Sequence, residues 1–440
     1  MWGSRSLVLL CLLSFVIAVV KASFKDRDFE VLFFFLPWSP LLKQRVGEIS
    51  FFTIALVIVF VLAVVRRHFS VQRYQIMIPA LLLITTLLAK MIQGFSLDRS
   101  YFLFFAMLVL FPCVVTKDLG HKESFSAVSL FFAVGIISAA LSAQAVAGYA
   151  NIAEFITVNS WAHVTRLAGY YGDPNFYSAQ IDACMACLLL LLAKEGSVGF
   201  RVGTIAALVV LLYCGLLAAS KSFVIVGACE LCIWVLLMLS RKGKKLSTYS
   251  LLIAAVGVLL FVLSTSAFQN LLDILGNRFS YSASASQITT GRTDIWANYL
   301  NLLTHNPKLA LFGEGFTSVL LDALYGRASH NTLIQCVYQF GVIGAPLLIA
   351  WVVCLFKSVL SHFSGKLDGM AFALMLVGVF LPWLGLDYLF FDDFFLLPWL
   401  VMKGTAYFSN PAPKEDQTRA DQECKRELPA LRITHSSEDK

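Results

Sequence analysis

Charged residues are scarce in this chain of 440 residues. Asp, Glu, Lys and Arg make up only 14% of it, whereas hydrophobic residues make up 58% and aromatic residues 13%. A soluble fold has too little interior to hide so many apolar side chains, and the mean hydropathy of +0.77 agrees with this. The composition therefore excludes an ordinary soluble domain and indicates an integral membrane protein.

Patterns typical of metal, redox and nucleic-acid proteins are also missing. The ten cysteines include two C-x-x-C pairs, Cys184 with Cys187 and Cys229 with Cys232, but both pairs lie inside apolar runs without a histidine at a ligand spacing. We interpret them as small core residues, and no disulfide framework is implied. The net charge of +7 is mostly a topology signal, so nucleic-acid binding is not expected.

Long apolar runs fill most of the chain. A helix needs about 20 residues to cross a bilayer, and runs near that length recur about twelve times. We expect spans at about residues 6–20, 49–66, 75–93, 99–115, 124–147, 176–194, 201–219, 222–240, 248–267, 334–357, 367–386 and 388–403. Continuous apolar runs must be helices, since barrel strands would alternate. The predicted fold class is all-α, a polytopic integral membrane protein.

The two ends of the chain differ from this pattern. Residues 1–23 resemble a signal peptide, but we interpret them as an uncleaved first helix. Residues 31–42 hold two prolines and are too short to span, so a re-entrant or interfacial segment is expected. We therefore divide the chain into an N-terminal part, 1–48, a transmembrane core, 49–403, and a charged tail, 404–440, that is expected to be disordered and cytoplasmic.

Basic residues gather in alternate short loops, for example at Arg66, Lys194 and Arg241. Cytoplasmic loops of membrane proteins carry such an excess of Lys and Arg. If these loops are cytoplasmic, the two longest loops, 148–175 and 268–333, lie outside and both termini lie inside. The second outer loop contains a helical pattern, so a long helical extracytoplasmic loop precedes the last three spans.

The first outer loop ends in polar residues directly before a span. Asp173 is expected to be the N-cap of that helix, with Pro174 at its first position and Asn175 beside it. Arg166, a few residues earlier, offers a planar fork of donors for phosphate oxygens. The alternative for Arg166 is an interfacial arginine with its stem in lipid and its head in water.

In the second outer loop, Arg292 starts an amphipathic helical pattern. Helix N-termini and arginine both favour anions, so Arg292 is a candidate phosphate ligand. His305 lies where this pattern stops and is interpreted as C-terminal capping or packing. A glycine turn is expected next, at Gly313 and Gly315.

His330 and Asn331 come just before the next span, at the expected membrane–water boundary. Histidine has an unperturbed pKa of about 6.5, so His330 can take a proton from a hydroxyl group near neutral pH. The alternative is a solvated or helix-capping histidine. Lys221 lies between two spans at their outer ends and can join Arg166 and Arg292 around His330. Three cations and one histidine indicate a multiply charged anionic substrate.

Taken in order, these motifs resemble the O-antigen ligase and polymerase superfamily of bacterial surface-polysaccharide assembly. The pattern is Arg166-x-x-Gly169, Asp173-Pro174-Asn175, Ser220-Lys221-Ser222, Gly291-Arg292, Trp296, Asn306-Pro307, Gly313-x-Gly315 and His330-Asn331 followed by Gly341-x-x-Gly344. The resemblance covers about residues 49–400. Lys221 stands where the family often has arginine, so the charge is kept but the bidentate contact is lost.

The resemblance implies a metal-independent inverting glycosyltransferase without a cofactor. Its donor would be an undecaprenyl-diphosphate-linked glycan, and its active site would face outward from the bacterial cytoplasmic (inner) membrane. By this resemblance Arg166 and Arg292 hold the diphosphate, Lys221 assists, and His330 activates the acceptor hydroxyl. Asn331 orients the acceptor or the sugar, and Asp173 and Asn175 are expected to bind substrate. The residues themselves agree, since a leaving diphosphate needs fixed cations and no acidic metal cluster appears in the outer loops.

Two activities of the superfamily, polymerase and ligase, are consistent with these residues. A polymerase transfers the growing glycan to the next lipid-linked repeat, whereas a ligase transfers a finished glycan to lipid A-core or another acceptor. The proline-containing segment at Pro37 and Pro40 and the Asp-Pro-Asn loop resemble capsular and exopolysaccharide polymerases more than lipopolysaccharide ligases. This resemblance favours a polymerase, with a flippase and a chain-length regulator as expected partners. A transporter is the alternative from another class, because Asp182 and Glu230 lie within spans and would be ion-coupling groups, together with acids near the last span, Asp387, Asp392 and Asp393. The lack of a broken helix pair in the sequence speaks against it.

Overall fold

The computed structural model describes most of the chain. The described residues are 2–23, 27–42, 51–66, 72–93, 100–118, 125–146, 159–161, 164–194, 197–241, 291–315, 329–360, 363, 365–389 and 392–409, with five isolated residues between 257 and 276. The elements of the first half are α1 (Trp2–Ser23), α2 (Asp28–Phe35), η1 (Leu36–Trp38), α3 (Ser39–Leu42), α4 (Phe51–Arg66), α5 (Arg73–Gln93), α6 (Ser100–Asp118), α7 (Phe125–Val146), β1 (Asn159–Trp161) and β2 (Val164–Arg166). Those of the second half are α8 (Pro174–Ala193), α9 (Val198–Leu217), α10 (Lys221–Ser240), α14 (Arg292–His305), α15 (Pro307–Phe312), α16 (Thr332–Leu360), α17 (Lys366–Phe380), η3 (Leu381–Gly385) and α18 (Asp393–Ser409).

The fold is an α-helical membrane bundle, as predicted. Within the described residues, seven helices are long and apolar enough to cross a membrane, and three shorter apolar helices accompany them. The strands β1 and β2 form one short antiparallel hairpin outside the helices. Most of the span predicted at 248–267 lies outside the described residues. The predicted spans otherwise agree with helices of the structure, although α18 begins at Asp393 and continues past the predicted end of the core to Ser409.

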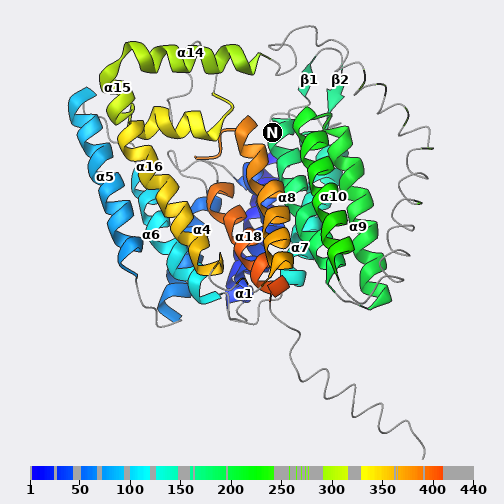
Figure 1. The fold of residues 1–440 in the computed structure, drawn as a ribbon. Helices are drawn as coiled ribbons and strands as arrows, with labels where there is room; N and C mark the ends of the chain where they lie inside the picture. Colours follow the sequence, from blue (N-terminus) through cyan, green and yellow to red (C-terminus); the bar gives the residue numbers. More distant parts are fainter. Residues whose placement is uncertain are drawn as a thin grey trace, which may run out of the picture.

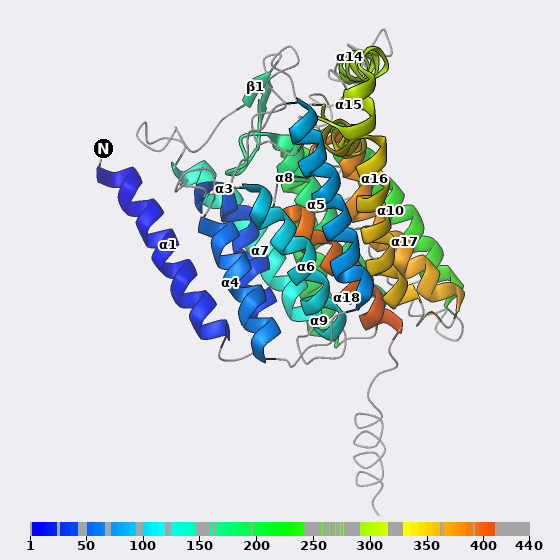
Figure 2. The same cartoon turned by 90° about the vertical axis from the view of Figure 1, so that its left-hand side faces the viewer.

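The helices stand side by side around α8 (Figure 1). The spanning part of α8 is 94% buried, against 28% for α9, so α8 is the central helix and α9 faces the surroundings. Both views of the ribbon show β1, β2, α14 and α15 at the same end of the bundle (Figures 1 and 2). We call this the loop end.

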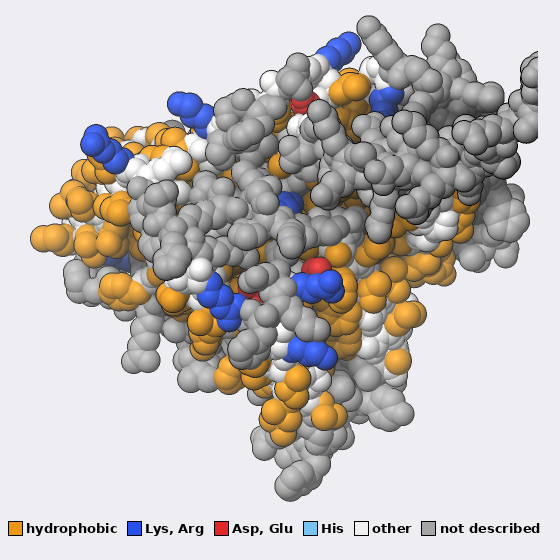
Figure 3. Space-filling view, turned by 90° about the horizontal axis from the view of Figure 1, so that it is seen from below, with side chains coloured by type: hydrophobic (Ala, Val, Ile, Leu, Met, Phe, Trp, Pro, Cys, Tyr) orange, Lys and Arg blue, Asp and Glu red, His pale blue; other side chains and the backbone are white. Residues whose placement is uncertain are grey.

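The opposite end carries the basic loops. Burial lowers the pKa of Lys194 and of Arg241, and the charge of Arg241 lowers the pKa of Lys194 further. The charge of Arg201 likewise lowers the pKa of Arg241. Cations at the ends of α8, α9 and α10 therefore lie near one another. Figure 3, which views the molecule from this side, shows further Lys and Arg side chains. We call this the basic end.

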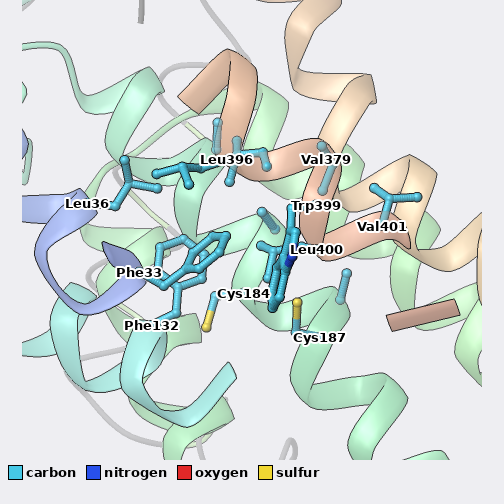
Figure 4. Close-up of a cluster of buried hydrophobic side chains, with 14 of the residues drawn as sticks. Phe33, Leu36, Phe132, Cys184, Cys187, Val379, Leu396, Trp399, Leu400 and Val401 are labelled. Carbon is cyan, nitrogen blue, oxygen red and sulfur yellow. The ribbon is translucent and has the colours of Figure 1, made fainter. Parts of the chain in front are cut away.

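The core gathers around Trp399 in the middle of α18. Its ring stacks on Phe29 of α2 with centroids 4.3 Å apart, and Phe33 lies 5.5 Å away. Cys184 and Cys187 belong to this buried cluster, as expected (Figure 4). The same interpretation is wrong for Cys232, which is exposed, because it lies on a face of α10 that the described residues leave uncovered.

Residues 28–42 form short helices that are buried inside the bundle. They run from Phe29, which stacks on Trp399, to Trp38, whose ring lies 5.2 Å from that of Tyr170 at the loop end. The chain is thereby returned to the end at which α1 begins, and the start of α1 and the end of α18 lie at opposite ends (Figure 2). These two helix ends do not share one side as expected for the termini, because this segment acts as an additional crossing, and the C-terminus itself lies outside the described residues.

The helix α16 is broken at Gly341, where φ is +67°. Its first part, up to Phe340, lies across the bundle at the loop end, and its second part runs down towards the basic end (Figure 1). A Cβ atom on Gly341 would lie 2.2 Å from the carbonyl oxygen of Leu311, so only glycine allows the end of α15 to approach this closely. A single broken helix is not the broken helix pair that the sequence was interpreted to lack, so this break does not contradict that interpretation.

Candidate functional site

Arg166 ends the β1–β2 hairpin and turns inward. Its side chain is 7% exposed, and its Nε donates to the carbonyl of Ala218 at 2.8 Å. One Nη donates to Oδ1 of Asn175 at 3.2 Å. The hairpin is tied to the turn between α9 and α10 by these bonds and by the bond from Leu167 N to Leu217 O. Arg166 is therefore held inside the protein and is not an interfacial arginine with its head in water.

Asp173, Pro174 and Asn175 form the start of α8 as predicted. Oδ1 of Asp173 accepts hydrogen bonds from the backbone N–H and the side-chain amide of Asn175, both at 2.8 Å. The side-chain oxygen of Asn175 also accepts from the hydroxyl of Ser220 at 3.0 Å. Asn175 thus joins Arg166 to the start of α10. The side chains of Asp173 and Asn175 form a hydrogen-bonded framework that holds Arg166. That Asp173 and Asn175 bind substrate stays a prediction.

Lys221 is the first residue of α10 and is half-buried. The turn before it is tight, since Ala219 has a φ of +47°. Ser220 and Ser222 on either side bond to one another at 2.8 Å. Because Ser220 also bonds to Asn175, Lys221 starts its helix beside the framework that holds Arg166.

Arg292 opens α14, as predicted, after Gly291 in the left-handed conformation. Its guanidinium packs on η3, where a Cβ atom on Gly385 would lie 2.6 Å from Nη1. Burial lowers the pKa of Arg292, whereas the carboxylates of Asp173 and Asp387 oppose this shift. Arg292 therefore lies between the start of α8 and the segment that follows α17.

The helix α14 is fixed over the first part of α16. The indole N–H of Trp296 donates to the carbonyl of Ser329 at 2.9 Å, and the rings of Tyr299 and Tyr338 meet edge to face at 5.2 Å. At its end, Nδ1 of His305 contacts the carbonyl of Asn301 at 2.8 Å, which confirms the predicted C-terminal capping. The turn predicted at Gly313 and Gly315 is also present, with φ of +73° and +80°.

His330 occupies a strained turn before α16, with a φ of +48°. Asp387 holds this turn: its Oδ2 accepts from the backbone N–H of His330 at 2.8 Å, and its Oδ1 accepts from the Ser329 hydroxyl and from Asn331 N–H, the latter at 3.2 Å. The Nδ1 atom of His330 lies 3.9 Å from Oδ2 of Asp387. The imidazole is 32% exposed, whereas the Asp387 carboxylate is 5% exposed, so a buried carboxylate backs a ring that water reaches.

Asn331 is the cap of α16. Its side-chain oxygen accepts from the backbone N–H groups of Leu333 at 2.9 Å and Ile334 at 3.2 Å. The capping role that was an alternative for His330 therefore belongs to Asn331. The predicted role of Asn331 in orienting acceptor or sugar stays a prediction.

The role of Asp387 in holding the turn at 329–331 was not predicted from the sequence. There, Asp387 was only one of the acids near the last span and a candidate ion-coupling group of a transporter. The signal that was present is its position: it follows a predicted span at the same end of the bundle as His330. Its bonds to the turn at 329–331 join residues 56 to 58 positions apart, and no local pattern reports such a contact.

The structure brings the predicted site residues together at the loop end. Arg166, Asn175 and Asp173 are joined by hydrogen bonds, Arg292 lies between Asp173 and Asp387, and Asp387 holds His330. Among the described residues, no group of three or more His, Cys, Asp or Glu could hold a metal ion. Independence from metal nevertheless stays a prediction, to be tested by chelation.

The family model described as O-antigen ligase matches residues 206–349, which include Lys221, Arg292, His330 and Asn331. Arg166, Asp173, Asn175 and Asp387 lie outside the matched stretch. No curated protein matches the chain.

Proposed function

Since the chain belongs to the O-antigen ligase and polymerase superfamily through its match over residues 206–349, we propose that it is a glycosyltransferase that polymerises lipid-diphosphate-linked oligosaccharides. The product would be a capsular, exopolysaccharide or O-antigen chain. The observation that carries this proposal is the convergence of Arg166, Arg292 and the His330–Asp387 pair, from four distant chain segments, at one end of a membrane bundle.

The donor is an undecaprenyl-diphosphate-linked glycan. When its glycosidic C–O bond breaks, the diphosphate keeps the electron pair and gains negative charge. Arg166, Lys221 and Arg292 supply fixed positive charge where this develops, and the partial burial of Arg166 and Arg292 strengthens the effect. Because Arg166 is held by Ala218 and Asn175, it does not need to reorganise during the reaction.

The acceptor hydroxyl attacks the anomeric carbon from the face opposite the leaving group, which inverts that centre. Its proton passes to Nε2 of His330, the ring nitrogen on the side away from Asp387. The imidazolium that forms has its Nδ1 close to the Asp387 carboxylate, which stabilises the new charge and fixes the turn that carries the ring. Asp387 is thus a positioning residue for His330.

The loop end faces outward in this proposal. The basic end carries Lys194, Arg201 and Arg241, and loops rich in Lys and Arg are retained in the cytoplasm. The reaction would then take place at the outer surface of the bacterial cytoplasmic membrane, where a flippase delivers the lipid-linked repeats and a chain-length regulator limits the product.

Deletion of the gene tests the proposal and separates the related activities. Lipid-linked glycans are extracted from the deletion strain and measured by mass spectrometry. A polymerase deletion leaves lipids with a single repeat exposed at the outer surface, whereas a ligase deletion leaves lipids with long glycan chains. Single repeats that stay on the cytoplasmic side would instead indicate a transporter and would refute the proposed transfer.

Purified protein supplies the complementary measurement. Reconstituted in nanodiscs with lipid-linked repeats from the deletion strain, the parent protein should form a ladder of longer chains. Absence of any ladder from protein that is folded and binds the lipid would exclude a polymerase.

A further inference from the structure

Two acidic side chains lie inside the membrane-spanning part of the bundle. Asp182 on α8 and Glu230 on α10 are both 0% exposed, and none of their four carboxyl oxygens has a hydrogen-bond partner among the residues that the structure describes. Asp182 is nine residues beyond Asp173 and Glu230 is nine residues beyond Lys221, so both lie about 13 Å below the loop end at 1.5 Å per residue. That depth is close to the middle of a hydrocarbon core of about 30 Å.

A third helix, α17, meets the pair at Gly378. A Cβ atom there would lie 2.5 Å from Oε1 of Glu230 and 3.2 Å from the backbone oxygen of Asp182. The glycine therefore leaves the space that the Glu230 carboxyl group fills. The three helices that meet here carry Asp173 and Asn175, Lys221, and the segment leading to Asp387 at their loop ends.

The groups that face the pair carry no positive charge within the described part of the chain. Glu230 faces Asp182 and the thiols of Cys184, Cys187 and Cys229. Asp182 faces Tyr388, whose pKa is raised by burial and by the carboxylates of Asp393, Asp182 and Asp173. A carboxylate in an apolar interior without a cation is strongly disfavoured, and two of them repel one another. Such groups take up protons instead.

We propose that Asp182 and Glu230 form a proton-binding site in which both carboxyl groups are protonated. The two side chains do not bond to one another as they stand, and the added protons let them turn and hydrogen-bond between α8 and α10. The uncharged pair joins three helices at mid-membrane depth and so fixes the distances among the site residues at their loop ends. The proton site stands without the proposed function, whereas this positioning role rests on it. The competing occupant is a monovalent cation such as sodium held by two carboxylates.

Infrared spectroscopy tests proton binding without any activity measurement. The purified protein is compared with Asp182→Asn, Glu230→Gln and the double variant at neutral pH, in sodium chloride and in choline chloride. The C=O band of protonated carboxylic acids should lose one residue's share in each single variant and two in the double variant, equally in both salts. Subtraction of the double variant from the parent corrects for other buried acids such as Glu30.

A parent-minus-double difference that contains only carboxylate bands, or a protonated band that sodium abolishes, would overturn the proposal. If the double variant fails to assemble, each single variant is subtracted from the parent in its place and should give one residue's share of the protonated band. In the parent itself, absence of the protonated band or its loss in sodium rejects the site.

The positioning role is tested by Glu230→Gln and Glu230→Leu. Glutamine can keep the hydrogen bond to a protonated Asp182 and should keep transfer within about threefold of the parent. Leucine fills similar volume without the bond and should lower kcat by about tenfold or more, with KM changed less. Thr204→Val is the matched control, since Thr204 is also buried but bonds only to Phe200 of its own helix at 2.8 Å. Equal kcat in Glu230→Leu and the parent would reject the positioning role and leave the infrared result standing.

Discussion

Replacement of Asp387 by asparagine is the sharpest test of the proposed site. The carboxylate holds the turn at 329–331 with three hydrogen bonds and lies 3.9 Å from Nδ1 of His330. Asparagine keeps the shape and one acceptor oxygen but removes the charge. Its amide N–H₂ must face a backbone N–H of His330 or Asn331, so one buried hydrogen bond is lost.

The expected magnitudes follow from this geometry. A buried N–H without an acceptor costs about 1–3 kcal/mol of folding stability. Two unit charges 3.9 Å apart attract by about 1 kcal/mol in water and by about 4 kcal/mol at an effective dielectric constant of about 20. Since the ring is 32% exposed, we expect an intermediate loss of about 2 kcal/mol in the transfer step, or about thirtyfold in rate.

The assay is single-turnover transfer by protein in nanodiscs, with thermal unfolding measured on the same preparations. Asp392→Asn is the matched control, because Asp392 is also a buried acid close in the chain but its Oδ1 accepts from the hydroxyl of Thr53 at 2.8 Å. A folded Asp387→Asn protein with a transfer rate within about twofold of the parent would refute the role given to Asp387. So would an equal loss of rate in the Asp392→Asn control.

Four further predictions concern the other parts of the site. His330→Asn should bind lipid-linked donor but transfer about 10²–10⁴-fold more slowly, because asparagine cannot take the proton at neutral pH; parental turnover in a folded variant would remove His330 from the mechanism. Arg292→Lys should lose on the order of a hundredfold in rate at unchanged expression, since lysine cannot make the planar two-point contact; near-normal polymer from this variant and from Arg292→Ala would leave Arg292 as an anchor of α14. Activity of the purified protein should survive EDTA, and a loss restored by magnesium would show that the cations do not replace a metal. In a background without other cysteines, Thr304→Cys on α14 should react with an impermeant thiol reagent in intact spheroplasts and Val198→Cys, at the basic end and 79% exposed, only after lysis; the reverse pattern would invert the topology.

The spans were predictable because hydrophobic length alone defines them. The predicted range 124–147 extends one residue beyond α7 at each end. The predicted range 222–240 begins one residue after the start of α10 and ends with it. The caps at Asp173 and His305 were also predictable, since each uses a bond within its own helix turn. Such features depend on neighbouring residues, which a sequence displays directly.

What could not be predicted depends on contacts between distant segments. The break in α16 lies inside an apolar run, and it exists because the backbone of Leu311 and Gly313 presses against Gly341. The role of Asp387 depends on a turn more than fifty residues away. The side on which α1 begins depends on whether residues 28–42 cross the membrane. The length of this segment alone does not decide whether it crosses.

The stacking of Phe29 on Trp399 joins two parts of the protein that are made far apart in time. During synthesis at about 5–20 residues per second, the 370 positions that separate them take about 20–70 seconds to follow, and α2 remains in the membrane without this partner. The same delay applies to the site, because Asp387 is made long after Arg166. In the proposed mechanism a nascent chain therefore carries cations that can attract lipid diphosphate before it can hold the histidine turn, and the proposed transfer begins only after the segment with Asp387 has been made.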